Sequence, residues 1–139
     1  MAGKEDPRHR VVVGALIERA GQILCHQRPP GHWGAGKWEF PGGKIDPGED
    51  PREALERECR EELAVEVRAG AVLDVQSHTY SDLGPLILLF FWCRLVDESA
   101  EPESLEGGAI RWCTREEMQE LDWLDADVPL VRGLLAHSK

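Results

Sequence analysis

The stretch 42–65, GGKIDPGEDPREALERECREELAV, constrains the fold of this chain more than any other segment. Its glycines and prolines are typical of a loop with tight turns, and Asp50, Pro51 and Glu53 together form the start signal of a helix. Three apolar side chains recur at every fourth position of that helix and share one face: Leu55, Cys59 and Leu63. This spacing predicts a helix from about residue 51 that packs on a core.

A second face of the same helix is acidic. It carries three glutamates at the spacing i, i+3 and i+4: Glu58, Glu61 and Glu62. Such like charges repel one another, so something positive is expected among them. Carboxylates are hard oxygen ligands that suit Mg²⁺ or Mn²⁺, and Glu49 and the backbone carbonyls around Gly42 could add further oxygens. The alternative is a solvated helix face whose glutamates pair with Arg57 and Arg60.

These residues resemble the Nudix box, G-x5-E-x7-R-E-U-x-E-E-x-G-U, in which U is an aliphatic residue. The matching positions are Gly43, Glu49, Arg57, Glu58, Cys59, Glu61, Glu62, Ala64 and Val65. Cys59 replaces an aliphatic residue, and Ala64 replaces the last glycine. Because glycine suits a left-handed helix end, Ala64 predicts a different exit from the helix. The resemblance implies an α/β (α+β) fold, the Nudix α/β/α sandwich with a mixed central sheet.

Length and composition predict one domain. The chain has 139 residues, of which 42% are hydrophobic and 30% charged, as is ordinary for a globular protein. Residues 1–9 contain no apolar run and are expected to form a flexible tail, which leaves 10–139 as a single domain. The longest apolar run, 86–93, is too short to span a membrane, so no membrane partner is expected. Whether the protein is a monomer or a homodimer is left open.

Cysteine spacing and net charge bear on the compartment and the partners. The four cysteines lie far apart without a CxxC pair, which predicts reduced core residues of a cytoplasmic protein, with zinc binding or disulfides as the alternative. A net charge of −10 argues against binding a nucleic acid polymer, since that mode needs a basic patch. A phosphate substrate remains compatible with this charge, because metal ions held by acidic side chains can supply the positive charge.

Strand and helix patterns alternate along the rest of the chain. Strands are predicted at 11–17, 22–28, 38–40, 65–75, 76–80, 86–95 and 109–113, and helices at 115–121 and 128–136. The run 86–95 is apolar enough to be a central strand that is buried on both faces. Residues 29–37 and 96–108 are predicted loops. Trp33 in the first loop is either part of a flap over a ligand or a plug over the core.

The resemblance extends over residues 11–136. Nudix enzymes use Mg²⁺ or Mn²⁺ to hydrolyse nucleoside diphosphates linked to another group, and MutT-type members convert nucleoside triphosphates to NMP and pyrophosphate. The run 38–44, WEFPGGK, is similar to that subgroup. It implies that Arg28 contacts a substrate phosphate, that the Gly42 carbonyl binds metal and that Asp127 reads the base. It also implies that the nucleotide pocket is lined by Glu39, Phe40, Pro41 and Gly42.

The resemblance further implies roles for the acidic face. Metal would be held by three side chains: Glu58, Glu61 and Glu62. Arg57 would orient Glu58 from the neighbouring turn. The proton of the attacking water would be taken by one of three carboxylates: Glu61, Glu106 or Glu49. All four glutamates of the box are present, which favours an enzyme over a Nudix-fold module that only binds a nucleotide.

Asp127 bears on the choice of base. An ionised aspartate can only accept hydrogen bonds, which favours a base with an exocyclic amine such as cytosine. Together with the WEFPGGK run, the segment 127–130 resembles relatives that act on CTP, dCTP and their modified forms, and this implies a role in nucleotide-pool sanitation. The alternatives are 8-oxo-dGTP, ADP-ribose or dinucleoside polyphosphates as substrates, and an Asp127 that only caps the last helix.

Overall fold

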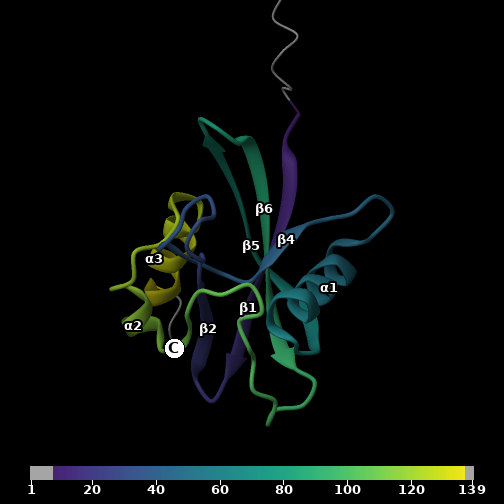
Figure 1. Cartoon of the computed structure of the whole chain (residues 1–139), viewed down its shortest axis with the longest axis vertical. Coiled ribbons are helices and arrows are strands. Elements are labelled where there is room, and N and C mark those ends of the chain that lie inside the picture. Colours follow the sequence, from purple (N-terminus) through teal and green to yellow (C-terminus); the bar gives the residue numbers. More distant parts are fainter. Residues whose placement is uncertain (1–7, 137–139) are drawn as a thin grey trace, which may run out of the picture.

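The computed structural model describes residues 8–136, and its strands form one mixed sheet (Figure 1). The strands are β1 (Arg10–Arg19), β2 (Gln22–Gln27), β3 (Trp38–Glu39), β4 (Gly42–Lys44), β5 (Val67–Tyr80), β6 (Gly84–Leu95) and β7 (Ile110–Cys113). The helices are α1 (Pro51–Leu63), α2 (Arg115–Met118), the 3₁₀ turn η2 (Asp125–Asp127) and α3 (Val128–Ala136). β1 and β6 run parallel, whereas β5 and β6 run antiparallel. The tail predicted at 1–9 lies largely outside the described residues, and the single domain stays a prediction.

The sheet is covered on both faces. α1 lies on one face, and α2 and α3 lie on the other (Figure 1). Successive residues of β1 serve the two layers in turn, because Ala15 and Ile17 belong to the core under α1, whereas Leu16 belongs to the core under α3. β6 lies between β1 and β5 and packs on both sides, as its apolar sequence predicts. The predicted α/β/α sandwich with a mixed sheet is confirmed.

β1 and β2 form a hairpin, but they pair only beside its turn, between residues 18–19 and 22–23. Farther from the turn the two strands part. There β1 pairs with β4 and β6, and β2 pairs with β3 and β7. Residues of both strands, Val12 and His26 among them, line the cavity described below. The divergence of the hairpin is therefore what opens space between its strands.

The segment Gly42–Lys44 is a strand, whereas the sequence analysis assigned its glycines to a loop. It pairs antiparallel with β1, and a Cβ on Gly42 would come within 1.9 Å of the Val13 carbonyl oxygen. Glycine is required here because two backbones approach closely and not because the chain turns. The pairing places the Gly42 and Gly43 backbone at one end of the cavity.

Two other boundaries differ from the prediction. Residues 67–80 form one long strand, β5, in place of the two strands predicted at 65–75 and 76–80, because its pairing with β6 continues without a shift from Asp74 to Tyr80. The helix predicted at 115–121 ends at Met118 and is followed by tighter turns. The four cysteines are buried and unpaired, as predicted.

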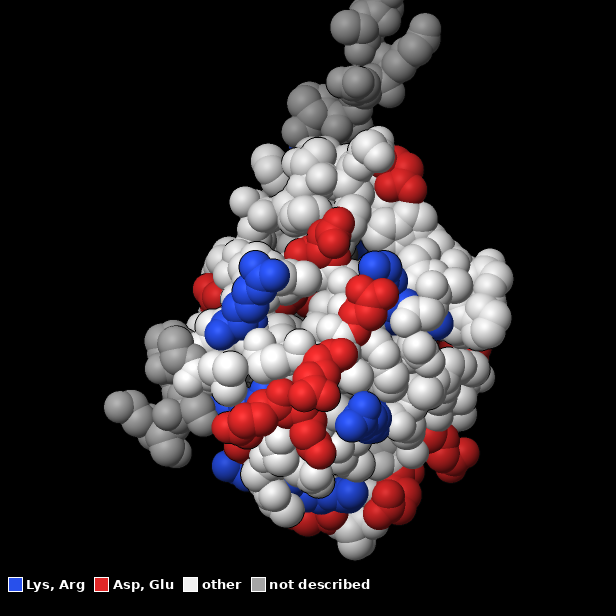
Figure 2. All heavy atoms as spheres, turned by 90° about the vertical axis from the view of Figure 1, so that its left-hand side faces the viewer, with Lys and Arg blue, Asp and Glu red and all other residues white. Residues whose placement is uncertain are grey.

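The surface carries the acidic excess of the sequence. The face shown in Figure 2 has a band of Asp and Glu side chains, with Lys and Arg scattered around it. This distribution fits the net charge of −10. Within residues 8–136, no helix is long and apolar enough to cross a membrane.

The start of α1 agrees with the prediction, but its C-terminal end does not. Asp50 and Glu53 form the capping box, in which each side chain accepts a hydrogen bond from the other residue's backbone N–H. The expectation of a different exit at Ala64 is wrong, since Ala64 adopts the left-handed conformation (φ 56°, ψ 34°) and its N–H donates to the Arg60 carbonyl. The left-handed conformation costs a residue with a Cβ about 1–2 kcal/mol, and the turn it makes leads directly into the buried Val65.

We expect Ala64→Gly to stabilise the protein. Glycine relieves the left-handed strain but adds freedom to the unfolded chain, so the net gain should be about 1 kcal/mol, or roughly 3 °C in Tm. The measurement is thermal unfolding beside Ala54→Gly, a control inside α1, which should lose about 1 kcal/mol or more. An Ala64→Gly protein that melts at or below the parent's temperature would contradict a strained helix exit.

Candidate active site

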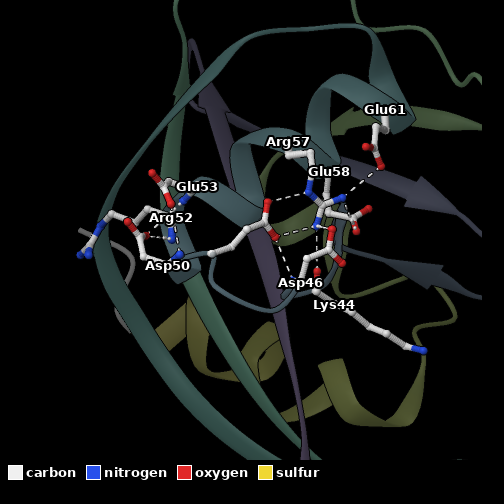
Figure 3. Close-up of polar contacts among 9 residues, drawn as sticks. Lys44, Asp46, Asp50, Arg52, Glu53, Arg57, Glu58 and Glu61 are labelled. Atoms are coloured by element: carbon white, nitrogen blue, oxygen red, sulfur yellow. Dashed lines mark hydrogen bonds and ion pairs between the residues drawn. The ribbon is translucent and has the colours of Figure 1, made fainter.

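Arg57 is the centre of a network that joins α1 to the loop before it (Figure 3). Its Nε and Nη2 donate to the two carboxylate oxygens of Glu49 at 2.7 and 3.0 Å, and Nη2 also donates to the Lys44 carbonyl. Its Nη1 reaches Glu58 at 3.2 Å and Glu61 at 3.1 Å. The hydrogen bond from Arg57 is the main reason why the pKa of Glu49 is lowered. The predicted contact between Arg57 and Glu58 is present.

Glu58 is seated against the Gly43 backbone. A Cβ on Gly43 would come within 2.5 Å of the Glu58 carboxyl carbon, so only glycine leaves room for this carboxylate. Burial raises the pKa of Glu58, and the nearby Arg57 opposes that rise. The glycine therefore shapes a cradle that holds a carboxylate beside the end of the cavity.

Of the three glutamates Glu49, Glu58 and Glu62, Glu62 is the one whose pKa is raised to about 9, mainly by burial. It is 9% exposed, and burial raises its pKa from 4.5 to about 9, with smaller contributions from the charges of Glu39, Glu58 and Glu106. These four acids come from α1, β3 and the 96–108 loop. The fold thus brings carboxylates from three segments to one place, which favours a bound cation.

The donor set fits a hard divalent cation, although the carboxylates are not yet gathered around one point. Within residues 8–136 no group of three or more His, Cys, Asp or Glu side chains is arranged to hold a metal ion. Arg57 is one reason, because it holds Glu58 and the exposed Glu61 toward itself. The donors are nevertheless all oxygens, which hard divalent cations such as Mg²⁺ or Mn²⁺ prefer, and Glu58 beside Gly43 and the buried Glu62 could supply them.

A cavity of about 340 Å³ begins beside Glu62 and runs between β1 and β2. It brings together eight of the predicted residues: Arg28, Trp33, Glu39, Phe40, Gly42, Glu62, Glu106 and Asp127. Arg57, Glu58 and Glu61 lie outside its wall, next to the lining residues Gly43 and Lys44. A volume of this size suits a small organic ligand.

Pro41 does not line this cavity, contrary to the prediction. Its side chain is fully buried, and its carbonyl accepts a hydrogen bond from the Ala15 N–H at 2.8 Å. Phe40 instead faces the cavity and stacks on Trp123 with the ring centres 4.8 Å apart. Pro41 therefore shapes the pocket only by anchoring the chain between β3 and β4.

The loop carrying Trp33 forms part of the cavity rim. The indole Nε1 donates to Asp82 at 2.7 Å, and the ring meets Tyr80 edge to face. Arg28 fixes this loop, because its Nε donates to the Trp33 carbonyl at 2.7 Å. Nη1 of the same side chain pairs with Glu39 on β3 at 3.2 Å. Trp33 is 36% exposed, which favours the flap and not the core plug.

Asp127 lies on the cavity wall with only 5% of its surface exposed. The backbone of Phe40 hydrogen-bonds to its carboxyl group, which lowers its pKa, but burial and the charge of Glu39 raise the pKa well above the ordinary value. The raised pKa favours a neutral Asp127 in the ligand-free protein, whereas the sequence analysis assumed an ionised one. A neutral carboxyl group both donates and accepts hydrogen bonds. Its bond to Phe40 also disfavours the alternative in which Asp127 only caps α3.

Three cavity residues escaped the sequence analysis: Arg10, His26 and Tyr80. His26 stands two positions before Arg28, and the alternation of a strand puts such residues on one side, so this signal could have found it. Burial lowers the pKa of His26, which keeps its ring neutral. Tyr80 is fixed because its hydroxyl accepts from the Ala126 N–H at 2.8 Å. Only the pairing of distant strands reveals Arg10 and Tyr80 as neighbours of the site.

Residues 7–134 match the family described as NUDIX domain, and the chain belongs to this family. It is 42% identical to the CTP pyrophosphohydrolase of Escherichia coli K12 over 125 residues, which are 90% of each protein. It is 36% identical to a putative 8-oxo-dGTP diphosphatase 2 of Mycobacterium tuberculosis, over 92% of this chain and 86% of that protein. The solution structure of the E. coli ORF135 protein superposes with a TM-score of 0.76 at 37% identity, covering 93% of this chain and 90% of that one.

Proposed function

We propose that this protein is a metal-dependent pyrophosphohydrolase that converts nucleoside triphosphates to NMP and pyrophosphate. The observation that carries the proposal is the convergence of Glu39, Glu62 and Glu106 in the cavity wall, with Glu58 close to Glu62 just outside it and Asp127 also lining the cavity. The names of the two relatives support the substrate class, since one is called a CTP pyrophosphohydrolase and the other a putative 8-oxo-dGTP diphosphatase 2. Pyrimidine and oxidised nucleotides are accordingly the first substrates to test.

In this proposal Mg²⁺ or Mn²⁺ is held by Glu58, Glu61, Glu62 and the Gly42 carbonyl. A bound ion supplies positive charge to the phosphates and lowers the pKa of the attacking water. Arg57 keeps Glu58 in the Gly43 cradle through its 3.2 Å contact. Arg28 offers the phosphates a guanidinium on the cavity wall, because Glu39 and the Trp33 carbonyl hold it there.

We assign the removal of the water proton to Glu106. Glu49 is engaged by two hydrogen bonds from Arg57, which lower its pKa and leave it a weak base. Glu61 is mostly exposed and also bound to Arg57. Glu106 lines the cavity and lies near enough to Glu62 to raise its pKa. Of the three carboxylates proposed from the sequence, it alone faces the space where substrate would react.

The proposal is tested by hydrolysing CTP, dCTP, UTP and 8-oxo-dGTP in ¹⁸O-labelled water with Mg²⁺ or Mn²⁺, and with excess EDTA as the control. We expect turnover only with metal, and the label in NMP, because attack at the α-phosphorus leaves pyrophosphate unlabelled. Label in pyrophosphate would mean attack at the β-phosphorus. Absence of turnover with any canonical or oxidised nucleoside triphosphate would refute the proposed function.

A neutral Asp127 changes the expected base preference. A carboxylic acid can donate to N3 of cytosine and accept from N4, or donate to O4 of uracil and accept from N3, so it matches either base. An asparagine amide offers the same pair of groups. We therefore expect Asp127→Asn to keep kcat/KM for CTP and UTP within about threefold of the parent near pH 6.5. Asp127→Ala, which leaves the base unpaired, should lose roughly tenfold to a hundredfold.

The same variant gives a pH test. Asp127 in the parent holds its proton at low pH and loses it as pH rises, whereas the amide of the Asp127→Asn variant carries no charge at any pH of the test. The ratio of kcat/KM for Asp127→Asn to that of the parent should therefore increase with pH. If Asp127→Asn instead reverses the ranking of CTP and UTP at neutral pH, Asp127 is ionised when substrate binds. A fully active Asp127→Ala would mean that the base is read elsewhere.

The cellular setting is part of the proposal. A cytoplasmic location is supported by four buried cysteines that remain unpaired. Binding of nucleic acid polymers is disfavoured by the acidic band of Figure 2 and the net charge of −10. The assembly state stays between monomer and homodimer, as the sequence analysis left it. Hydrolysis of ADP-ribose or dinucleoside polyphosphates is the second activity to screen.

A further inference from the structure

His26 is buried in the cavity wall and is only 2% exposed. Within residues 8–136, its Nδ1 is the single buried side-chain nitrogen or oxygen atom without a hydrogen-bond partner. Buried polar atoms are paired in the large majority of cases, so an unpaired one beside a cluster of acids calls for a functional reason.

The hydrogen bonds around His26 determine which ring nitrogen carries the proton. Nε2 lies 3.2 Å from the Ser104 hydroxyl oxygen. That hydroxyl has one hydrogen, which it donates to the Gly107 carbonyl, so it must accept from His26. Nε2 is therefore the donor, and Nδ1 carries the lone pair. Ser104 and Gly107 stand on either side of Glu106, which means that His26 holds the turn bearing this acid.

The other side of the imidazole faces α1. Nδ1 lies 3.8 Å from the Glu62 carboxylate, a distance too long for a direct hydrogen bond. The loop is also attached to α1 itself, because the Leu105 N–H donates to the Glu62 carbonyl at 3.0 Å. The ring therefore lies between Glu62 and the turn carrying Glu106, two acids that belong to separate segments.

We propose that His26 is a positioning residue that fixes Glu106 beside Glu62. There the carboxylate of Glu106 can take the proton of the attacking water, and its negative charge adds to the affinity of the site for the metal ion. The inference rests on the proposed function. His26 holds the loop through the hydrogen bond that Nε2 donates to Ser104. The lone pair of Nδ1 faces Glu62 on the other side of the ring. Side chains that orient metal ligands typically account for ten- to a hundredfold of metal affinity or activity.

Two matched variants separate the ring nitrogens. Glutamine at position 26 can place an amide N–H near the position of Nε2, whereas the shorter asparagine reaches only the position of Nδ1. We expect His26→Ala and His26→Asn to weaken the binding of Mn²⁺ alone by about tenfold or more, and His26→Gln to stay within about threefold of the parent. Titration of Mn²⁺ by electron paramagnetic resonance measures this without turnover.

Hydrogen exchange provides a second readout. The amides of residues 104–108 should exchange faster in His26→Ala and His26→Asn and at the parent rate in His26→Gln. Cys25→Ala is the control, because it removes a fully buried neighbour on β2 from the opposite core layer. It should lower stability but leave Mn²⁺ affinity and this exchange unchanged. If Cys25→Ala reproduces the His26→Ala losses, the role of His26 is structural and the inference is overturned.

A double-mutant cycle tests whether His26 acts through Glu106. In the Glu106→Gln background, His26→Ala should cost less than about threefold in Mn²⁺ affinity, because the positioned group is already neutralised. Fully additive losses would overturn the inference. If the parent binds Mn²⁺ and cleaves nucleoside triphosphates while all His26 variants match it, only this inference fails. If the parent does neither, the proposed function fails and the inference fails with it.

Discussion

Glu62→Gln should reduce kcat/KM by about a hundredfold or more while leaving the metal-free protein at least as stable as the parent. The loss of activity is expected because an amide cannot replace a carboxylate that holds a divalent ion. Stability should not fall, because the native site is a poor place for a charge. Glu62 is 9% exposed and lies near Glu39, Glu58 and Glu106, so the folded parent must keep a proton on this side chain, which a neutral isostere does not need.

The measurement combines steady-state kinetics with urea unfolding in EDTA. Glu66→Gln is the control, since it neutralises an exposed carboxylate just beyond the end of α1 that pairs with Arg60 at 3.1 Å. We expect this control to keep the parent's activity. Glu61→Gln should lose a similar factor to Glu62→Gln if both side chains hold metal. If Glu62→Gln stays active or simply unfolds, the acidic face is structural.

The second large effect is a fall in the stability of the metal-free protein as pH rises from about 5 to about 9. Glu62 has a pKa of about 9 in the folded protein and an ordinary value of 4.5, so between these values the folded state keeps a proton that the unfolded state has lost. Raising the pH then favours unfolding. The raised pKa values of Glu39, Glu58 and Asp127 act in the same direction.

Urea unfolding at pH 5, 7 and 9 in EDTA measures this slope. The lowered pKa values of Glu49 and His26 have the opposite sign. That of Glu49 acts only at acid pH, below the range of the test, and that of His26 acts only below its ordinary value of 6.5, so the fall in stability should be clearest between pH 7 and pH 9. Glu62→Gln should flatten the slope, and saturating Mg²⁺ should restore most of the stability at pH 9, because it binds only the folded state. A parent protein with equal stability at pH 5 and pH 9 in EDTA would show that the acids are adequately solvated.

Local signals made α1 and its loop predictable from the sequence. The capping box at Asp50 and Glu53 involves residues three apart, and the buried column of Leu55, Cys59 and Leu63 follows from helical spacing. The acidic face could be read in the same way, because its spacing is also local. A helical wheel does not show how deeply each side chain is buried. It therefore did not predict that Glu61 is exposed while the adjacent Glu62 is buried.

The remainder of the site depends on contacts between distant segments. Tyr80 meets Trp33 and Ala126 only after β5 and the flap loop are placed beside each other. Pro41 was assigned to the pocket by resemblance, but its direction depends on the pairing of β4 with β1. The charge state of Asp127 likewise depends on burial, which residue type does not reveal. Sequence reasoning therefore found the chemistry of the site better than its geometry.

Arg57 gives the site an internal competitor. Its guanidinium already neutralises Glu58 and Glu61, so an arriving ion must displace one positive charge to gain these two carboxylates. If these carboxylates hold the metal as proposed, metal binding at this place is an exchange of cations and not the filling of an empty site. Such an exchange would lower the apparent affinity for metal, and activity would respond to the free metal concentration over the range where the ion competes with Arg57.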